Sequence, residues 1–169
     1  RPPFEGPMAL ATSALDRGRA IHRLLQVLPG MANDDRARAA DRYVERALPG
    51  LPDPERQAMV GRVLGILADP AFAIAFQGAA AAEVSVMGTL TLRGQERSVT
   101  GRIDRLAITD DRVLIVDYKT GQPPQADAIP ESHVAQLAIY RALLKPLYPA
   151  HAITAALLYT GAPVLIPLS

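Results

Sequence analysis

The hydrophobic period of this 169-residue chain changes near residue 77, and this change constrains the fold more than any other feature. Before it, apolar residues recur every three or four positions, which is the period of an amphipathic helix. After it, apolar and polar residues alternate, which is the period of a half-buried strand. A chain with helices first and strands later is expected to form an α/β or α+β domain with a mixed sheet.

Three helices are expected before the change, because two breaks rich in proline and glycine divide the periodic segment. They are predicted over residues 15–28, 33–48 and 53–67. Asn33 or Asp34 is expected to cap the second helix, and Pro54 is compatible with the first turn of the third. Residues 1–12 are expected to be irregular, and residues 70–76 to form a short apolar helix or a loop.

Five strands are expected after the change. Their segments read AEVSVMGTLTLRG, RSVTGRIDRLAIT, RVLIVDYKT, AITAALLYT and PVLIPL. A helix from Glu131 or Ser132 to about Leu144 follows the third strand. The length fits one domain. The expected divisions are a single domain over 1–169, with a mainly helical part over 1–76 and a sheet core over 77–169.

The composition excludes several classes of site. The chain has no cysteine, so it has no disulfide, thiolate metal site or iron–sulfur cluster, and a reducing, cytoplasmic location is expected. No apolar run reaches the roughly 18–20 residues of a membrane span, so no membrane partner is expected. The net charge is +1, so a nucleic acid would have to be bound by a local patch.

The segment VLIVDYKTG ends an apolar run with an aspartate and a lysine. Asp117 follows this run, and Asp104 lies in the preceding strand segment, GRIDRLAI. If residues 110–111 form a two-residue hairpin turn, Asp104 lies directly opposite Asp117, with Cβ atoms about 4.5–5.5 Å apart. A four-residue loop gives the same register, whereas a three-residue loop does not.

Two opposed carboxylates repel each other unless a cation lies between them, so this pairing favours a divalent metal site. Lys119 is two residues after Asp117 and points to the same face. The chain has two lysines against sixteen arginines, and lysine is the cation that can share a proton or act as a compact charge. The alternative is a solvent-facing hairpin with ordinary surface charges. The apolar flanks argue against it, because unpaired charge is costly to bury.

The segments GRIDR, VDYKTG and QLAIY together resemble the RecB-type nuclease domains of the PD-(D/E)XK superfamily. With RGRAIHRLLQVLP and AALLYT, the chain is most similar to the C-terminal nuclease domain of AddA subunits in bacterial AddAB helicase–nucleases. The resemblance implies a restriction-endonuclease-like α/β fold, in which helices flank a mixed central sheet and a helical segment precedes it. It also implies that the chain is a C-terminal piece of a longer helicase–nuclease.

By this resemblance, the metal ligands are His22, Asp104, Asp117 and the backbone carbonyl of Tyr118. Asp104, Asp117 and Lys119 are the expected catalytic residues. His22 ends the Gly-x-x-x-His motif of that family, which begins here at Gly18. Without this motif, a lone helical histidine is more often structural. The acidic residue before Lys119 is an aspartate and not a glutamate, and the family permits this replacement.

Five further residues are expected to support the site or to contact DNA. Gln136 and Tyr140 match the Gln-x-x-x-Tyr motif and share one helix face, although a polar edge on a packing helix would look the same. Glu83 is a candidate acidic residue ahead of the hairpin. Arg102 and Arg19 are candidate DNA contacts, and Arg19 lies on a basic helix side that could equally be a solvated face.

The implied activity is that of a Mg²⁺-dependent exonuclease that cuts DNA during unwinding in double-strand break repair. Mn²⁺ is expected to be accepted as well, and an iron–sulfur cluster is not expected. The implied partners are DNA, an AddB-type subunit and ATP-binding helicase domains of the same full-length chain. The alternative is a catalytically silent nuclease-like module that binds DNA or a partner. An unrelated metal or sugar-phosphate enzyme is disfavoured, because the sequence has no glycine-rich phosphate loop.

Overall fold

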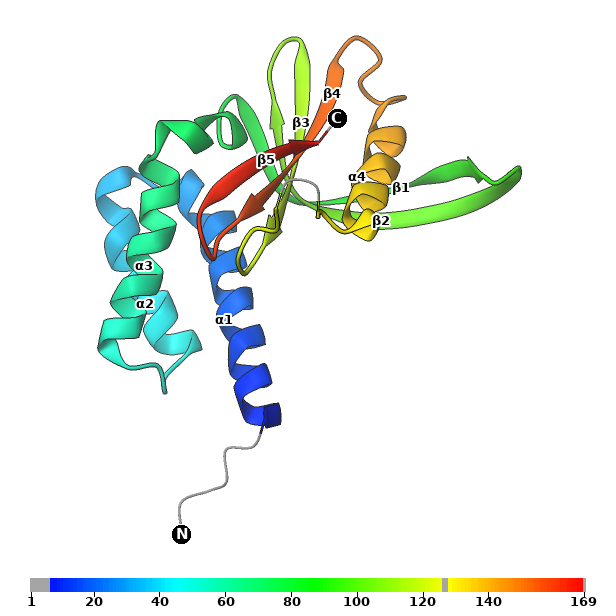
Figure 1. The fold of residues 1–169 in the computed structure, drawn as a ribbon. Coiled ribbons are helices and arrows are strands. Elements are labelled where there is room, and N and C mark those ends of the chain that lie inside the picture. Colours follow the sequence, from blue (N-terminus) through cyan, green and yellow to red (C-terminus); the bar gives the residue numbers. More distant parts are fainter. Residues whose placement is uncertain (1–6, 126–127, 169) are drawn as a thin grey trace. The chain divides into compact units, whose positions relative to one another are not determined.

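The computed structural model describes residues 7–125 and 128–168. The chain forms two compact units that divide after Leu67, before the expected change of period near residue 77. The helices and strands of both units are coloured along the sequence in Figure 1. In the described residues, no helix combines the length and the apolar character that a membrane span requires.

The first unit is helical. Its elements are α1 (Pro7–Val27), the 3₁₀ turn η1 (Leu28–Gly30), α2 (Asn33–Ala47) and α3 (Asp53–Ala68). The prediction that residues 1–12 are irregular is wrong for 7–12, because α1 begins at Pro7, and proline fits a first helical position. Residues 1–6 lie outside the described part. The predicted cap of α2 is also wrong, since the N-cap is Ala32 and forms no side-chain cap bond.

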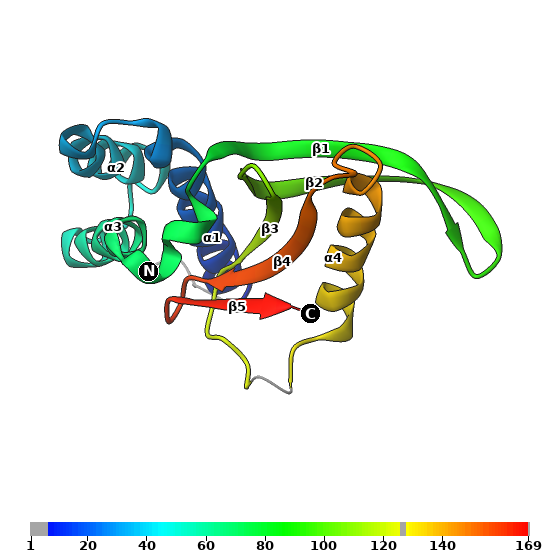
Figure 2. The ribbon, with the colours of Figure 1, turned by 90° about the horizontal axis from the view of Figure 1, so that it is seen from above.

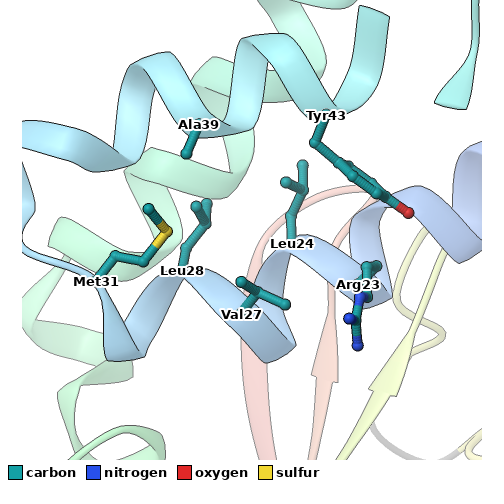
Figure 3. Close-up of a pocket in the computed structure, with 7 residues that line it drawn as sticks. All are labelled: Arg23, Leu24, Val27, Leu28, Met31, Ala39 and Tyr43. Atoms are coloured by element: carbon teal, nitrogen blue, oxygen red, sulfur yellow. The ribbon is translucent and has the colours of Figure 1, made fainter. Parts of the chain in front are cut away.

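Apolar side chains of the three helices form the interior of this unit. Leu25 and Leu28 are fully buried, as are Val44 of α2 and Val63 of α3. Figure 3 shows a largely apolar cavity of about 200 Å³ within the same unit. Its lining residues are Arg23, Leu24, Val27, Leu28, Met31, Ala39 and Tyr43.

The second unit is a five-stranded sheet with one long helix and a short 3₁₀ helix. Its elements are η2 (Pro70–Ala75), β1 (Ala79–Leu92), β2 (Gln95–Ile108), β3 (Arg112–Lys119), α4 (Glu131–Leu144), β4 (Ala152–Tyr159) and β5 (Val164–Leu168). The strands follow one another across the sheet in chain order. β3 and β4 are parallel and the other neighbours are antiparallel, so the predicted mixed sheet is confirmed. The parallel pair is joined through α4, the usual solution for a parallel connection.

α4 packs against the sheet through a continuous apolar cluster. Leu137 and Leu144 of α4 are buried with Ile115 and Leu157 of the central strands. The contact extends along β1 and β2, and Figure 2 shows their long hairpin beside α4. Glycine permits this close approach: a Cβ at Gly101 would overlap the ring of Tyr140. The helix therefore holds the strands that carry the candidate site.

Candidate active site

The β2–β3 hairpin has the register that the turn at residues 110–111 predicts. The N–H of Thr109 donates to the carbonyl of Arg112 at 2.9 Å and closes the turn. Ladder pairs run from Ile108–Val113 to Arg105–Val116. Continued by one residue, this register sets Asp104 opposite Asp117.

The backbone ladder between β2 and β3 ends at the Arg105–Val116 pair. Beyond it, the Asp104 carboxylate replaces a backbone carbonyl as the hydrogen-bond acceptor from β3. Oδ2 of Asp104 accepts a hydrogen bond from the backbone N–H of Tyr118 at 2.8 Å. Burial raises the pKa of Asp104 from 3.8 to about 7, the Tyr118 N–H opposes the rise, and the charge of Asp117 adds to it. Asp104 therefore holds a proton at higher pH than an exposed aspartate does.

Asp117 is buried beside the ammonium of Lys119. The residue is 7% exposed, and Lys119 Nζ lies 2.8 Å from Asp117 Oδ2. In the described part of the chain, no group donates a hydrogen bond of acceptable geometry to Asp117 Oδ2. The ammonium of Lys119 is its ion-pair partner. A buried carboxylate oxygen thus keeps a lone-pair direction open to a further cation.

This donor set fits a divalent cation with hard oxygen ligands. Asp104 and Asp117 supply carboxylate oxygens, and the backbone carbonyl of Tyr118 directly follows Asp117 in the chain. Mg²⁺ is usually bound through one or two carboxylates and keeps several waters. Among the residues that the structure describes, no three histidine, aspartate or glutamate side chains form one metal-binding group. The fit therefore rests on the two aspartates.

Gln136 and Tyr140 lie one turn apart on α4, as predicted, and form a chain of hydrogen bonds. Gln136 Nε2 donates to the Tyr140 hydroxyl at 3.0 Å, and that hydroxyl donates to the carbonyl of Arg102 at 3.1 Å. Tyr140 is 6% exposed. Its hydroxyl therefore anchors β2 two residues before Asp104.

The sequence of this chain matches a known family model. The match is to the PD-(D/E)XK nuclease superfamily and covers residues 5–165. The chain belongs to this superfamily. The predicted restriction-endonuclease-like fold is thereby confirmed, whereas nothing in the match distinguishes the AddA type.

Other comparisons add little to the superfamily assignment. No curated protein matches the chain. A solved structure named "Crystal structure of SSO0001" is similar at 16% sequence identity and a TM-score of 0.40, over 98% of this chain and 79% of that one. This similarity is too distant to bear on the function.

Glu83 lies beside the two candidate carboxylates in the sheet. The β1–β2 pairs on either side, Ala82–Arg105 and Val84–Ile103, set Glu83 opposite Asp104. Glu83 itself has a φ of 50° and leaves the ladder, a conformation that costs a non-glycine residue roughly 1–2 kcal/mol. The register thus carries acidic residues across β1, β2 and β3. The side chain of Glu83 is turned toward an arginine, since Oε1 lies 3.8 Å from Arg102 Nη1.

The remaining predicted residues belong to the helical unit. His22 lies on α1 and is half-buried, with Gly18 buried one turn earlier. Arg19 is exposed, and its guanidinium is 3.9 Å from Asp16. Metal ligation by His22 and DNA contact by Arg19 stay predictions.

Arg105 is a residue of the second unit that the sequence interpretation missed. It is 5% exposed, its Nε donates to the carbonyl of Ala75 at 3.0 Å, and its guanidinium lies 4.7 Å from the ring centre of Phe76. Burial raises the pKa of Tyr118, and the charge of Arg105 opposes that rise. Arg105 therefore joins η2 to β2 and β3 next to both aspartates. The signal in the sequence was an arginine directly before the apolar residues Leu106, Ala107 and Ile108.

The end of β3 is fixed by the loop that follows β4. Thr160 N donates to the carbonyl of Lys119 at 2.9 Å, and Gly161 N donates to Gly121 O at 2.8 Å. A Cβ at Gly161 would overlap the backbone of Gly121. Only glycine fits there without displacement. The loop contact therefore holds the end of β3, which carries Lys119.

Replacement of Arg105 by methionine is expected to lower the free energy of unfolding by about 2–3 kcal/mol, because the carbonyl of Ala75 loses its buried donor. The matched control is Arg97→Met, since Arg97 is an exposed arginine of the same strand. Urea denaturation of both variants in chelator checks this. Equal midpoints for Arg105→Met and wild type would contradict the anchoring role.

Tyr140→Phe is expected to lower the free energy of unfolding by about 1–2 kcal/mol, because the buried carbonyl of Arg102 loses its donor. Cleavage should fall as well, since β2 is less firmly held. The control is Gln136→Ala, which removes an exposed partner and leaves the Arg102 bond. A Tyr140→Phe variant that is as stable as the wild type would show that this hydroxyl does not hold the strand.

Asp104→Asn is expected to stabilise the metal-free domain at pH 8. The folded state keeps a proton between pH 3.8 and about 7 that an unfolded aspartate has lost. Stability from this group is therefore present at low pH and is lost as pH rises through that window. Asparagine can still accept from Tyr118, and it carries no charge. Urea denaturation in chelator at several pH values checks this, and a constant gap between variant and wild type from pH 4 to pH 8 would contradict it.

Proposed function

We propose that this chain is a metal-dependent deoxyribonuclease domain that hydrolyses phosphodiester bonds. The observation that carries the proposal is the group formed by Asp104, Asp117 and Lys119 at the end of the β2–β3 hairpin. Two opposed carboxylates, of which Asp117 is buried, destabilise a purely structural hairpin. The same group suits a site that receives a cation and a phosphate.

The proposed chemistry divides between the cation and the side chains. Mg²⁺, when bound, polarises the phosphate and stabilises the leaving oxygen. Asp104 and Asp117 would hold it, and Asp104, whose pKa is raised to about 7 by burial, would have to be deprotonated first. Lys119, fixed by Asp117 and by the loop after β4, orients the attacking water or takes its proton. Ligation by His22 would favour Mn²⁺, which accepts imidazole more readily than Mg²⁺.

The biological setting proposed here is a helicase–nuclease of double-strand break repair. The support is the resemblance of the motifs to the AddA nuclease domain. In that setting, helicase domains of the same full-length chain and an AddB-type subunit are the partners, and the enzyme is cytoplasmic. As an exonuclease, the domain cuts a strand while the motor unwinds DNA.

A cleavage assay with linear DNA tests the proposal. Cleavage is expected with Mg²⁺ or Mn²⁺ and should disappear with excess chelator. The assay is run on the chain alone and on the assembled helicase–nuclease. DNA binding without cleavage under every condition would favour the silent binding module. Cleavage that persists in chelator would contradict metal dependence.

A further inference from the structure

The helical unit has an apolar cavity of about 200 Å³ between α1 and α2, and the proposed nuclease chemistry does not use it. Its walls are mainly aliphatic, with Met31 at one end and with Arg23 and Tyr43 at the other (Figure 3). Val27 lines the cavity and is 42% exposed, so the apolar lining reaches solvent. An apolar cavity of about 150 Å³ can hold a benzene molecule. This cavity is therefore large enough for a leucine or phenylalanine side chain.

A stripe of exposed arginines flanks the cavity on α2. Arg38, Arg42 and Arg46 are exposed and follow one another at intervals of four residues, so they share one side of the helix. Ala39 and Tyr43, which line the cavity, directly follow the first two of these arginines in the chain. The third lies three residues after Tyr43 and thus on its side of the helix. This arginine stripe therefore runs along the edge of the cavity.

The arginine stripe has no counter-charge within the fold. In the described part of the chain, no carboxylate forms an ion pair with any of its three members. Asp41 of the same helix pairs with Arg56 of α3 instead. Across the cavity, the guanidinium of Arg23 has a neutral partner, since its Nη1 donates to Gln26 Oε1 at 2.9 Å. Like charges four residues apart destabilise a helix slightly, so an external anionic group would stabilise this surface.

The apolar cavity and the cationic edge together distinguish between classes of partner. A nucleic-acid backbone would pair with the arginines and leave the cavity unfilled. A base turned into the cavity would bury its hydrogen-bonding groups against aliphatic side chains, which is costly. An acidic protein segment satisfies both features, because carboxylates pair with arginines and an apolar side chain fills the cavity. The two features therefore favour a protein partner over a nucleic acid.

We propose that the cavity and the arginine stripe bind an acidic segment of a protein partner, which inserts one leucine or phenylalanine side chain between α1 and α2. The inserted side chain is the anchor of the contact, and the arginines select the acidic residues on either side of it. The whole surface lies within the helical unit and uses neither carboxylate of the candidate active site. The docking site is therefore independent of the proposed nuclease function.

The test uses two synthetic peptides and the isotope-labelled full chain. One peptide is rich in glutamate and has a central phenylalanine, and the other has alanine at that position. Amide NMR shifts report the site and the affinity of each peptide at several salt concentrations. The shifts should concentrate at Leu24, Val27 and Ala39. The phenylalanine peptide should bind about tenfold more tightly, because burial of the ring is favourable, and the affinity of both peptides should fall with added salt.

Variants of the full chain separate the cavity from the charges. Ala39→Leu fills the cavity and should lower the affinity for the phenylalanine peptide to that for the alanine peptide. The Arg42→Gln, Arg46→Gln double variant should weaken both peptides by about tenfold at low salt and reduce their salt dependence. The matched control is Arg62→Gln, because Arg62 is an exposed arginine of α3 outside the cavity lining. It should bind both peptides as the wild type does.

Several outcomes would overturn the docking site. Equal affinity for the two peptides, no binding of either, or shifts that lie away from the cavity would each do so. An oligothymidylate that binds the same residues more tightly than the phenylalanine peptide would assign the arginine stripe to nucleic acid instead. Cleavage of DNA in Mg²⁺ by the double variant should match the wild type, and a loss would show that the stripe serves the substrate. If the wild type never cuts DNA while the peptide results hold, the docking site stands and the nuclease proposal fails.

Discussion

Asp117→Ala abolishes metal-dependent DNA cleavage, as the geometry of the site leads us to expect. A methyl group cannot replace the buried oxygen that faces Lys119, and a lost ligand removes the cation together with its effect on the phosphate. The expected loss is at least about 1,000-fold in kcat/KM, comparable to or above that of removing one preorganised electrostatic contact. Cleavage of single-stranded DNA in Mg²⁺ and in Mn²⁺ measures it.

The control for this change is Asp110→Ala, because Asp110 is an exposed aspartate in the turn of the same hairpin. It should cut at the wild-type rate. Mn²⁺ titration by calorimetry accompanies both variants and should show lost binding for Asp117→Ala alone. Residual cleavage within tenfold of wild type by a folded Asp117→Ala variant would remove Asp117 from the reaction.

The β2–β3 register could be predicted because a short turn determines it. A two-residue connection leaves one register for the whole hairpin, so Asp104 and Asp117 could be paired from the sequence. Lys119 followed from the two-residue period of a strand. The pairing of Gln136 with Tyr140 followed in the same way from the helical period. Local periodicity and turn length were sufficient for these contacts.

Other features depend on packing that no local pattern encodes. The burial of Arg105 arises where η2 meets β2, and η2 is a segment for which the sequence left helix and loop open. The termination of the ladder beside Asp104 depends on its side chain replacing a backbone partner of Tyr118. The positive φ of Glu83 interrupts a strand that reads as regular. Metal ligation by His22 depends on how two units assemble, so the family motif alone supports it.

Lys119→Ala should separate metal binding from catalysis. The ammonium is not a ligand to a cation, so its removal should leave metal binding intact or tighten it by relieving like-charge repulsion. Cleavage should nevertheless fall about 100- to 1,000-fold, the usual cost of losing one preorganised charge at a reacting phosphate. Lys119→Arg should not restore it, because a guanidinium is larger and keeps its proton. Calorimetric titration of Mn²⁺ beside a cleavage assay measures both quantities.

The loss of Lys119 should also change the stability of the domain in a metal-dependent way. Without metal, the buried Asp117 carboxylate loses the cation 2.8 Å away, and such an uncompensated charge is destabilising. A divalent cation can replace the ammonium, so Mn²⁺ should stabilise Lys119→Ala more than it stabilises the wild type. Lys145→Ala is the control, since Lys145 is exposed and is the other lysine of the chain. Wild-type cleavage by Lys119→Ala in the assembled enzyme would show that catalysis does not depend on this strand.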